Sequence, residues 1–196
     1  MTGARLGEDA GAAGRAGTWD TATAGVVLAR LGPRPQPPLS FFTPAEEAAA
    51  EALLDHLLAR SPKDPPVPVL SVIDERLATG QGDGWRYADV PEDGEAWRRS
   101  LAALDEDARV RHAGRVFAGI GYGDRDRLLH HVLHLGPRDW YGMPAAHVWS
   151  LWTRYACEAY YAHPYAWDEI GFGGPAYPRG YLRLGRGVRE PWEEPR

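Results

Sequence analysis

Only one cysteine, Cys157, occurs among the 196 residues, so the chain cannot form an internal disulfide bond. Such scarcity is compatible with a reducing compartment. Cys157 stands among apolar residues of a predicted helix, and we expect it to pack in the core rather than to act as a reactive thiol. No run of about 18 apolar residues is present, so the sequence predicts no membrane span.

Basic runs are also lacking. The net charge is −5 and the isoelectric point is near 5.8, whereas nucleic-acid-binding surfaces are normally basic, so we expect no nucleic-acid partner. The N-terminal region has neither a twin-arginine pair nor a signal-peptide pattern, because its apolar stretch, Ala22–Leu31, is interrupted by Gly25 and Arg30. From these features we expect a cytoplasmic protein.

Signatures of catalysis and cofactor binding are few. No serine lies in a Gly-x-Ser-x-Gly motif, and no Walker loop occurs. The glycines of residues 119–124 lack the last glycine of a dinucleotide-binding loop, and Gly171-x-Gly173-x-x-Ala176 is followed by Pro178 where a helix should begin. The acidic run Asp105–Asp107 suits the start of a helix. We therefore expect no catalytic residue and no cofactor in this chain.

Histidines supply one alternative. His130, His131 and His134 form H-H-x-x-H, and His130 and His134 are four residues apart on a predicted helix, so both can reach one metal ion. Histidines on amphipathic helices are common, and the metalloprotease motif requires a glutamate where His131 stands. A stand-alone metal-dependent enzyme using His130 and His134 is the alternative function. A third ligand is left open among three residues: His147, Glu158 and His163.

Apolar residues recur at helical spacing, and no segment shows sustained alternation. The sequence thus predicts an all-α fold, a compact bundle of about five to six helices. Thr43, Pro44 and Glu46 form a capping box with proline at the first helical position. In the fourth helix, Val110 and Phe117 are expected to face inward. The expected helices cover residues 44–60, 69–78, 95–104, 105–117, 124–134 and 144–162.

Composition divides the chain into three segments. Residues 1–39 are rich in Gly, Ala and Pro, and we expect them to be disordered or loosely docked, with Thr23–Leu31 as the part that docks. Residues 40–164 form the helical domain, in which Trp85 and Tyr87 anchor a connection. Residues 165–196 are expected to form an irregular arm.

The arm lies in the most aromatic part of the chain, since 13 of the 21 aromatic residues fall between Trp140 and Trp192. Its centre, Trp167–Tyr181, is too rich in Gly and Pro for a helix. Large aromatic rings are stabilised when they pack against another surface. Three surfaces are open here: the chain's own helices, a partner protein, or a second copy in a self-associating protein. The candidate partner-binding residues are Trp167, Phe172, Tyr177, Arg179 and Tyr181.

Two sets of motifs carry a family resemblance. The first is Phe41-Phe42-Thr43-Pro44-Ala45-Glu46, a helix ending near Pro62, and then Val72-Ile73-Asp74-x-Arg76-Leu77. The second is Glu158–Pro164, followed by Trp167-x-x-Ile170-Gly171-Phe172 and Gly174–Tyr181. Over roughly residues 40–182 the chain resembles the gluconate 2-dehydrogenase subunit 3 family.

The resemblance implies a small, helical, non-catalytic accessory subunit. Such subunits bind and stabilise a large FAD-dependent sugar or sugar-acid dehydrogenase of the GMC oxidoreductase type, often with a cytochrome c subunit. The FAD and the catalytic base belong to the large subunit, and the small subunit commonly carries a twin-arginine export signal. This chain departs from the pattern in lacking that signal and in shortening the loop after the last long helix to Tyr165-Ala166.

Overall fold

The computed structural model describes residues 16–32, 38–60, 67–176, 180 and 185–188. The described residues are mostly helical, with a single two-stranded sheet among them, which confirms the all-α prediction. The chain divides into two compact units, one of residues 37–159 and one that combines residues 1–36 with 160–196. The predicted N-terminal segment and the predicted arm therefore belong to the same unit.

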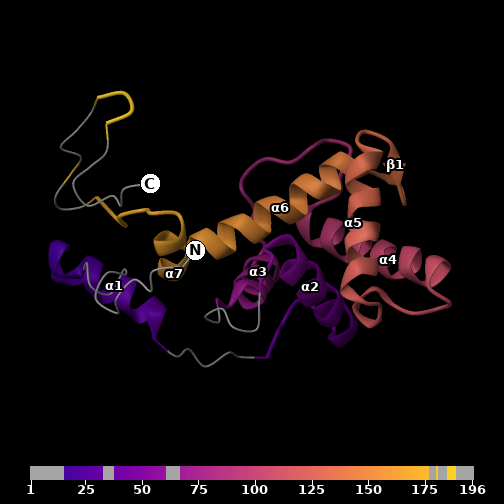
Figure 1. The fold of residues 1–196 in the computed structure, drawn as a ribbon, viewed down its shortest axis with the longest axis horizontal. Helices are drawn as coiled ribbons and strands as arrows, with labels where there is room; N and C mark the ends of the chain where they lie inside the picture. Colours follow the sequence, from indigo (N-terminus) through magenta and orange to yellow (C-terminus); the bar gives the residue numbers. More distant parts are fainter. Residues whose placement is uncertain (1–15, 33–37, 61–66, 177–179, 181–184, 189–196) are drawn as a thin grey trace, which may run out of the picture. The chain divides into compact units, whose positions relative to one another are not determined.

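The larger unit holds most of the helices (Figure 1). Within it, α2 contacts α3, α4 and α5. Its elements are α2 (Pro44–Leu57), α3 (Val69–Ala78), α4 (Asp93–Arg111), the 3-10 turn η2 (Phe117–Gly119), α5 (Tyr122–Leu135), β1 (Asp139–Trp140), β2 (Met143–Pro144) and nearly all of α6 (Ala145–Tyr161). The smaller unit contains η1 (Ala16–Thr18), α1 (Thr21–Leu31) and α7 (Pro164–Glu169). No helix in the described ranges combines the length and apolar character needed to cross a bilayer.

Helix α2 begins as the sequence predicts. The Thr43 hydroxyl accepts the Glu46 N–H at 3.4 Å, and the Glu46 carboxylate accepts the Thr43 N–H at 2.8 Å, which completes the capping box. Phe42, just before the cap, is 6% exposed and meets Trp97 edge-on at 5.9 Å between ring centroids. The start of α2 is thus fixed both by its cap and by an aromatic contact with α4.

Helix α4 corrects the prediction of two helices over residues 95–117. One continuous helix runs from Asp93 to Arg111, because its buried face continues through Leu101, Leu104 and Ala108 without interruption. Aspartate disfavours a helix interior only weakly, so Asp105–Asp107 does not end it. Val110 was expected to face inward but is 72% exposed.

Two members of the acidic run, Asp105 and Asp107, have partners outside α4 instead of a capping role. Asp105 accepts the N–H of Phe117 at 2.9 Å, which brings η2 back to α4, and Phe117 is fully buried as predicted. Asp107 accepts the indole N–H of Trp140 at 3.2 Å. Burying an N–H without a partner is costly, and Asp107 removes that cost for Trp140.

The β1–β2 hairpin is too short to show alternation in the sequence. Asp139 pairs with Pro144 and Trp140 with Met143. The two turn residues, Tyr141 and Gly142, have φ angles of 52° and 80°, and two positive φ values are the requirement of a type I′ hairpin turn.

The burial of Cys157, on α6, differs from the prediction. Cys157 is exposed, so the expected core packing is wrong. Partial burial and the neighbouring Glu158 carboxylate raise the pKa of the Cys157 thiol, which keeps the thiol protonated.

A buried carboxylate joins α3 to the segment before α2. Asp74 is 3% exposed and accepts the N–H groups of Ser40, Phe41 and Phe42 at 2.7, 3.0 and 2.9 Å. The Ser40 hydroxyl donates to it as well, at 3.2 Å. Burial alone would raise the pKa of Asp74, but the backbone donors outweigh it and lower the pKa below 3.8.

Replacing Asp74 with Asn should lower the free energy of unfolding by about 2 kcal/mol at neutral pH, because the amide leaves several backbone donors without an anionic acceptor. The contribution of Asp74 is present above pH 3.8 and is lost as pH falls through its depressed folded pKa. The difference between the two proteins should therefore shrink in acid. Urea unfolding at neutral pH and below pH 3.8 measures the difference in the free energy of unfolding. Glu75→Gln, at an exposed neighbour on α3, is the matched control. An equal loss in the control would contradict this assignment.

Candidate functional site

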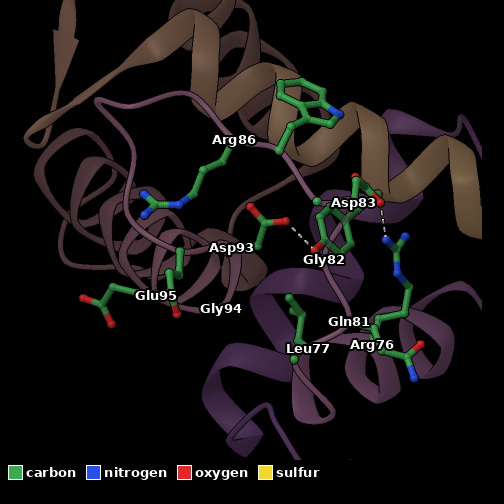
Figure 2. Close-up of a pocket in the computed structure, with 14 residues that line it drawn as sticks. Arg76, Leu77, Gln81, Gly82, Asp83, Arg86, Asp93, Gly94 and Glu95 are labelled. Carbon is green, nitrogen blue, oxygen red and sulfur yellow. Dashed lines mark hydrogen bonds and ion pairs between the residues drawn. The ribbon is translucent and has the colours of Figure 1, made fainter.

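The larger unit contains a hollow of about 490 Å³ beside Trp85 (Figure 2). We call it the Trp85 hollow. It is bounded by the end of α3, the connection of residues 80–86, the first turn of α4 and Tyr155 of α6. Its volume lies in the range of about 300–1,000 Å³ that is usual for ligand sites. No local pattern in the sequence predicts this hollow, because its walls come from four separate segments.

Glycines allow the connection to leave α3 and present Trp85. Gly80 and Gly84 have φ angles of 66° and 76°, which residues with a Cβ rarely adopt. Asp83, between them, points back toward α3 and α6 and is partly buried.

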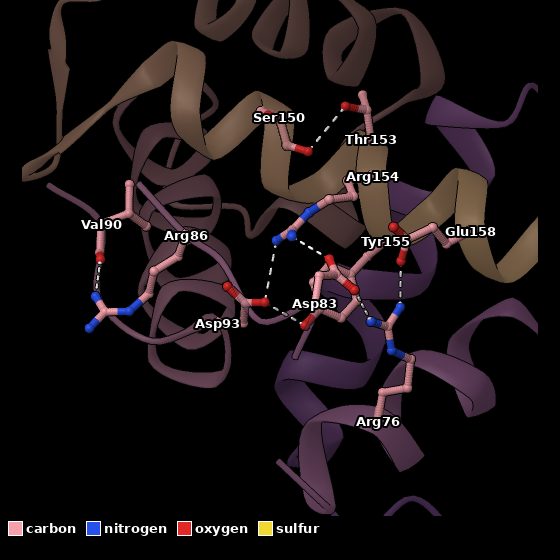
Figure 3. A network of polar contacts seen from close by, with 10 residues as sticks. All are labelled: Arg76, Asp83, Arg86, Val90, Asp93, Ser150, Thr153, Arg154, Tyr155 and Glu158. Atoms are coloured by element: carbon pink, nitrogen blue, oxygen red, sulfur yellow. Dashed lines mark hydrogen bonds and ion pairs between the residues drawn. The ribbon is translucent and has the colours of Figure 1, made fainter. Parts of the chain in front are cut away.

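A polar network fixes the wall of the hollow (Figure 3). The Arg154 guanidinium pairs with Asp83 and, at 3.3 Å, with Asp93 at the start of α4. The Arg76 guanidinium pairs with Asp83 and with Glu158, each at 2.5 Å. Positive and negative side chains therefore alternate from α3 to α6. The Arg76–Glu158 and Asp83–Arg154 contacts each join residues more than seventy positions apart.

Tyr155 completes the network. Its hydroxyl donates to Asp93 at 2.7 Å, and the Arg76 guanidinium lies 4.7 Å from its ring centroid. Burial and the Asp93 carboxylate both raise the pKa of Tyr155. Burial alone would lower the pKa of Arg76, but its hydrogen bonds with Glu158 and Asp83 outweigh burial and raise it. Both shifts move away from neutral pH, so these two groups suit a fixed charge pattern for binding better than proton transfer.

The side chains after Asp83 form an ordered aromatic group on the surface. Trp85 is 54% exposed, with the Arg154 guanidinium 4.9 Å from its ring centroid and Tyr87 edge-on at 5.5 Å. Tyr87, 39% exposed, stacks on His147 at 3.7 Å with parallel rings, and His147 contacts Asp89 at 2.8 Å. The two expected anchors are therefore held in place but remain accessible.

The histidines of the alternative metal hypothesis lie on α5. The Nδ1 atom of His130 contacts the Asp126 carbonyl at 3.0 Å, and that of His134 contacts the His130 carbonyl at 2.6 Å. Of the possible third ligands, His147 pairs with Asp89 and Glu158 with Arg76. Across the described ranges, no group of three or more His, Cys, Asp or Glu side chains is placed to hold a metal ion.

The first candidate of the arm is packed inside the smaller unit. Trp167 is 7% exposed and clusters with Trp19 and Val27. Its indole N–H donates to the Tyr161 carbonyl at 2.8 Å. Trp167 lies on α7, although its segment was expected to be non-helical, because His163 caps this short helix ahead of its Gly- and Pro-rich part.

The remaining candidates differ in how far they can be described. Phe172 is 42% exposed and meets Trp167 edge-on at 5.6 Å, so one side of its ring is accessible. Tyr177, Arg179 and Tyr181 lie outside the described residues. Of the described candidates, Phe172 is therefore the one with an accessible ring.

The arm contacts Trp19, which lies between η1 and α1, at Gly174 and Pro175. The Trp19 indole N–H donates to the Pro175 carbonyl at 3.1 Å. Gly174 has a φ of 78°, and a Cβ added there would lie 2.6 Å from Cζ2 of Trp19. Trp19 therefore requires glycine at this position.

Replacing Gly174 with Ala should displace Trp19 and loosen α1. Gly171→Ala is a matched control, because Gly171 has a φ of 67° but nothing within 4 Å of its added Cβ. Both variants carry the strain of positive φ, about 1 kcal/mol, and Gly174→Ala adds roughly 1–3 kcal/mol of overpacking. Amide exchange of residues 21–31 should accelerate far more in Gly174→Ala. Equal acceleration in both variants would mean that the Trp19 contact is unimportant.

Replacing Tyr155 with Phe tests the network through pH. Below the ordinary tyrosine pKa of 10.0, the wild type should be more stable by about 1–2 kcal/mol, because it keeps the bond to Asp93. Above it the unfolded wild type loses the phenol proton while the folded protein keeps it, so that advantage should fall by up to about 1.4 kcal/mol per pH unit. Denaturant unfolding from neutral to alkaline pH measures the difference, and a constant difference would refute the raised pKa.

Comparison with known proteins identifies a family. The family model described as gluconate 2-dehydrogenase subunit 3 matches residues 44–174. The matched region begins at the first residue of α2 and includes Asp74, the polar network and Trp167, but it ends before Tyr177. No curated protein and no solved structure matches the chain. Since the match covers well over half of the 196 residues, the chain belongs to the gluconate 2-dehydrogenase subunit 3 family.

Proposed function

We propose that this chain is a non-catalytic accessory subunit that binds and stabilises a large FAD-dependent sugar or sugar-acid dehydrogenase of the GMC type. The observation that carries the proposal is the family match over residues 44–174. The network around Arg154 agrees with it, since the shifted pKa values found there suit binding rather than proton transfer.

The smaller unit offers one surface for such a partner. Its described apolar cluster has only three buried members, Trp19, Val27 and Trp167, and small cores give little stability by themselves. Large apolar side chains of the same unit remain exposed, and such side chains are common at protein interfaces. They include Val26, Leu28, Ile170 and Phe172.

We assign the FAD to the partner and no cofactor to this chain. Gly121 precedes α5, but a 3-10 turn rather than a strand leads into it, so the glycines of residues 119–124 lack the βα turn of a dinucleotide site. The sheet in the described part of the chain is a hairpin of two short strands. This arrangement supports flavin binding elsewhere in the complex.

Affinity purification of the tagged full chain from its native host tests the proposal. We expect a larger subunit in stoichiometric amount and the absorption bands of a flavin in the eluate. A haem band would reveal the cytochrome c subunit, and fractionation of the host tests the cytoplasmic location expected from the sequence. A colourless chain that elutes alone would refute the accessory role, and its mass by light scattering would then test self-association.

Substitutions in the smaller unit test its part in the complex. Replacing Phe172 or Ile170 with Ala should weaken binding to the large subunit by roughly tenfold, because each removes exposed apolar area next to the Trp167 cluster. Val110→Ala is the control, since Val110 is 72% exposed on α4. If both variants bind as tightly as the control, the contact surface lies elsewhere.

A further inference from the structure

His163 connects two helices of the smaller unit through its ring. It is the residue before α7, and its Nδ1 atom accepts the N–H of Tyr165 at 3.3 Å, which caps the helix. Its other ring nitrogen, Nε2, contacts the carbonyl of Arg30 at 2.9 Å. Arg30 lies in the last turn of α1, so one imidazole links the start of α7 to the end of α1.

These two contacts together require one protonation state of the ring. The Tyr165 N–H is a donor, so Nδ1 must offer a lone pair, and the Arg30 carbonyl is an acceptor, so Nε2 must carry the hydrogen. The neutral imidazole with its hydrogen on Nε2 satisfies both. In the imidazolium both nitrogens are donors, so the Nδ1–H would face the Tyr165 N–H and the cap would be lost. A positive charge at the N-terminus of a helix is also unfavourable.

Histidine differs from the residues that usually cap helices. Ser, Thr, Asp and Asn are the preferred capping residues, and α1 and α2 use Asp20 and Thr43. Those side chains remain acceptors between about pH 5 and 8, whereas a histidine ordinarily changes its charge in that range. The cap of α7 is therefore one that mild acid can remove, while the caps of α1 and α2 persist.

The other charged groups at this junction belong to residue types that keep their charge in the same pH range. The Arg30 guanidinium donates to the Ala162 carbonyl at 3.0 Å, so a permanent positive charge lies close to His163 and opposes its protonation. Glu169, at the far end of α7, accepts the hydroxyl of Tyr160 at 2.8 Å. In the smaller unit, the charged or titratable groups on the ends of α1 and α6 and on α7 are Arg30, Tyr160, Tyr161, Tyr165, Asp168 and Glu169. Histidine alone among these residue types ordinarily titrates between about pH 5 and 8.

The helices that His163 links carry the exposed apolar side chains of the smaller unit. Val26 and Leu28 lie on α1, and Ile170 and Phe172 follow directly after α7. The described apolar cluster of this unit has only three buried members, so it holds α1 and α7 together weakly by itself. The hydrogen bonds of His163 therefore contribute a substantial share of what keeps these side chains on one surface.

We propose that His163 makes the docking surface of the smaller unit sensitive to pH. The neutral ring ties α1 to α7, and protonation in mildly acidic solution releases the first turn of α7 and weakens binding of the large subunit. The inference rests on the proposed function where it concerns the large subunit. Because the folded unit binds this proton less readily than the unfolded chain, its stability rises with pH through the range in which histidine titrates.

Amide exchange of the full chain at about pH 7.5 and about pH 5 tests the link between the helices. Protection factors, which are corrected for the intrinsic effect of pH on exchange, should fall roughly fivefold in acid for α1 and α7, as expected for the loss of one helix cap. In His163→Asn the amide oxygen caps α7 at both pH values, so its protection factors should not change. His131→Asn, at an exposed histidine of α5, is the matched control and should behave like the wild type. No acid loss in the wild type, or an equal loss in His163→Asn, overturns the proposal.

Binding of the co-purified large subunit separates this inference from the proposed function. From about pH 7.5 to about pH 5, the wild type and His131→Asn should lose roughly fivefold more affinity than His163→Asn. Titration of the large subunit itself affects all three chains equally, so the comparison isolates His163. If no partner co-purifies, the proposed function fails, and the exchange measurement still decides whether His163 links the helices. If a partner binds with the same pH dependence to all three chains, the proposed function stands and pH-sensitive docking is overturned.

Discussion

The larger unit depends on the placement of one guanidinium group between two carboxylates. Arg154 lies on α6, Asp83 in the connection after α3, and Asp93 at the first residue of α4, and their contacts join α6 to two segments that are far from it in the sequence. Partly buried ion pairs of this kind add little net stability because desolvation offsets their attraction. Their effect is to specify one arrangement, since removing any member leaves a charge without its partner.

Several buried indoles donate their N–H groups to acceptors within the protein. Trp152 donates its indole N–H to Ser100 at 2.9 Å, Trp140 donates to Asp107, and Trp167 donates to a carbonyl of the smaller unit. These three rings are buried with their polar edges satisfied, so they contribute their apolar area without an unpaired donor. The buried indole N–H of Trp97 has no such acceptor in the described part of the chain. The bond from Trp140 also gives Asp107 a role in the interior of α4 that does not depend on capping the helix.

Local signals in the sequence predicted local structure well. The capping box of Thr43 and Glu46 located the start of α2, and apolar spacing gave α3 with its observed bounds. Features that depend on distant residues were not predictable in this way. Asp74 contacts residues more than thirty positions away, and Arg154 contacts Asp83 over seventy-one positions, and no spacing rule connects such pairs. The motif containing Asp74 and Arg76 marked both residues, but their roles required the fold.

The contact between Trp19 and Pro175 has a consequence for how the chain is made. These residues are 156 positions apart, so α1 emerges from the ribosome long before the segment that covers Trp19 exists. At ordinary rates of synthesis the delay is on the order of ten seconds, during which all of residues 37–159, the larger unit, are synthesised. The Trp19 cluster therefore closes last, and a chain that has not been synthesised through Pro175 leaves this tryptophan without the acceptor for its N–H.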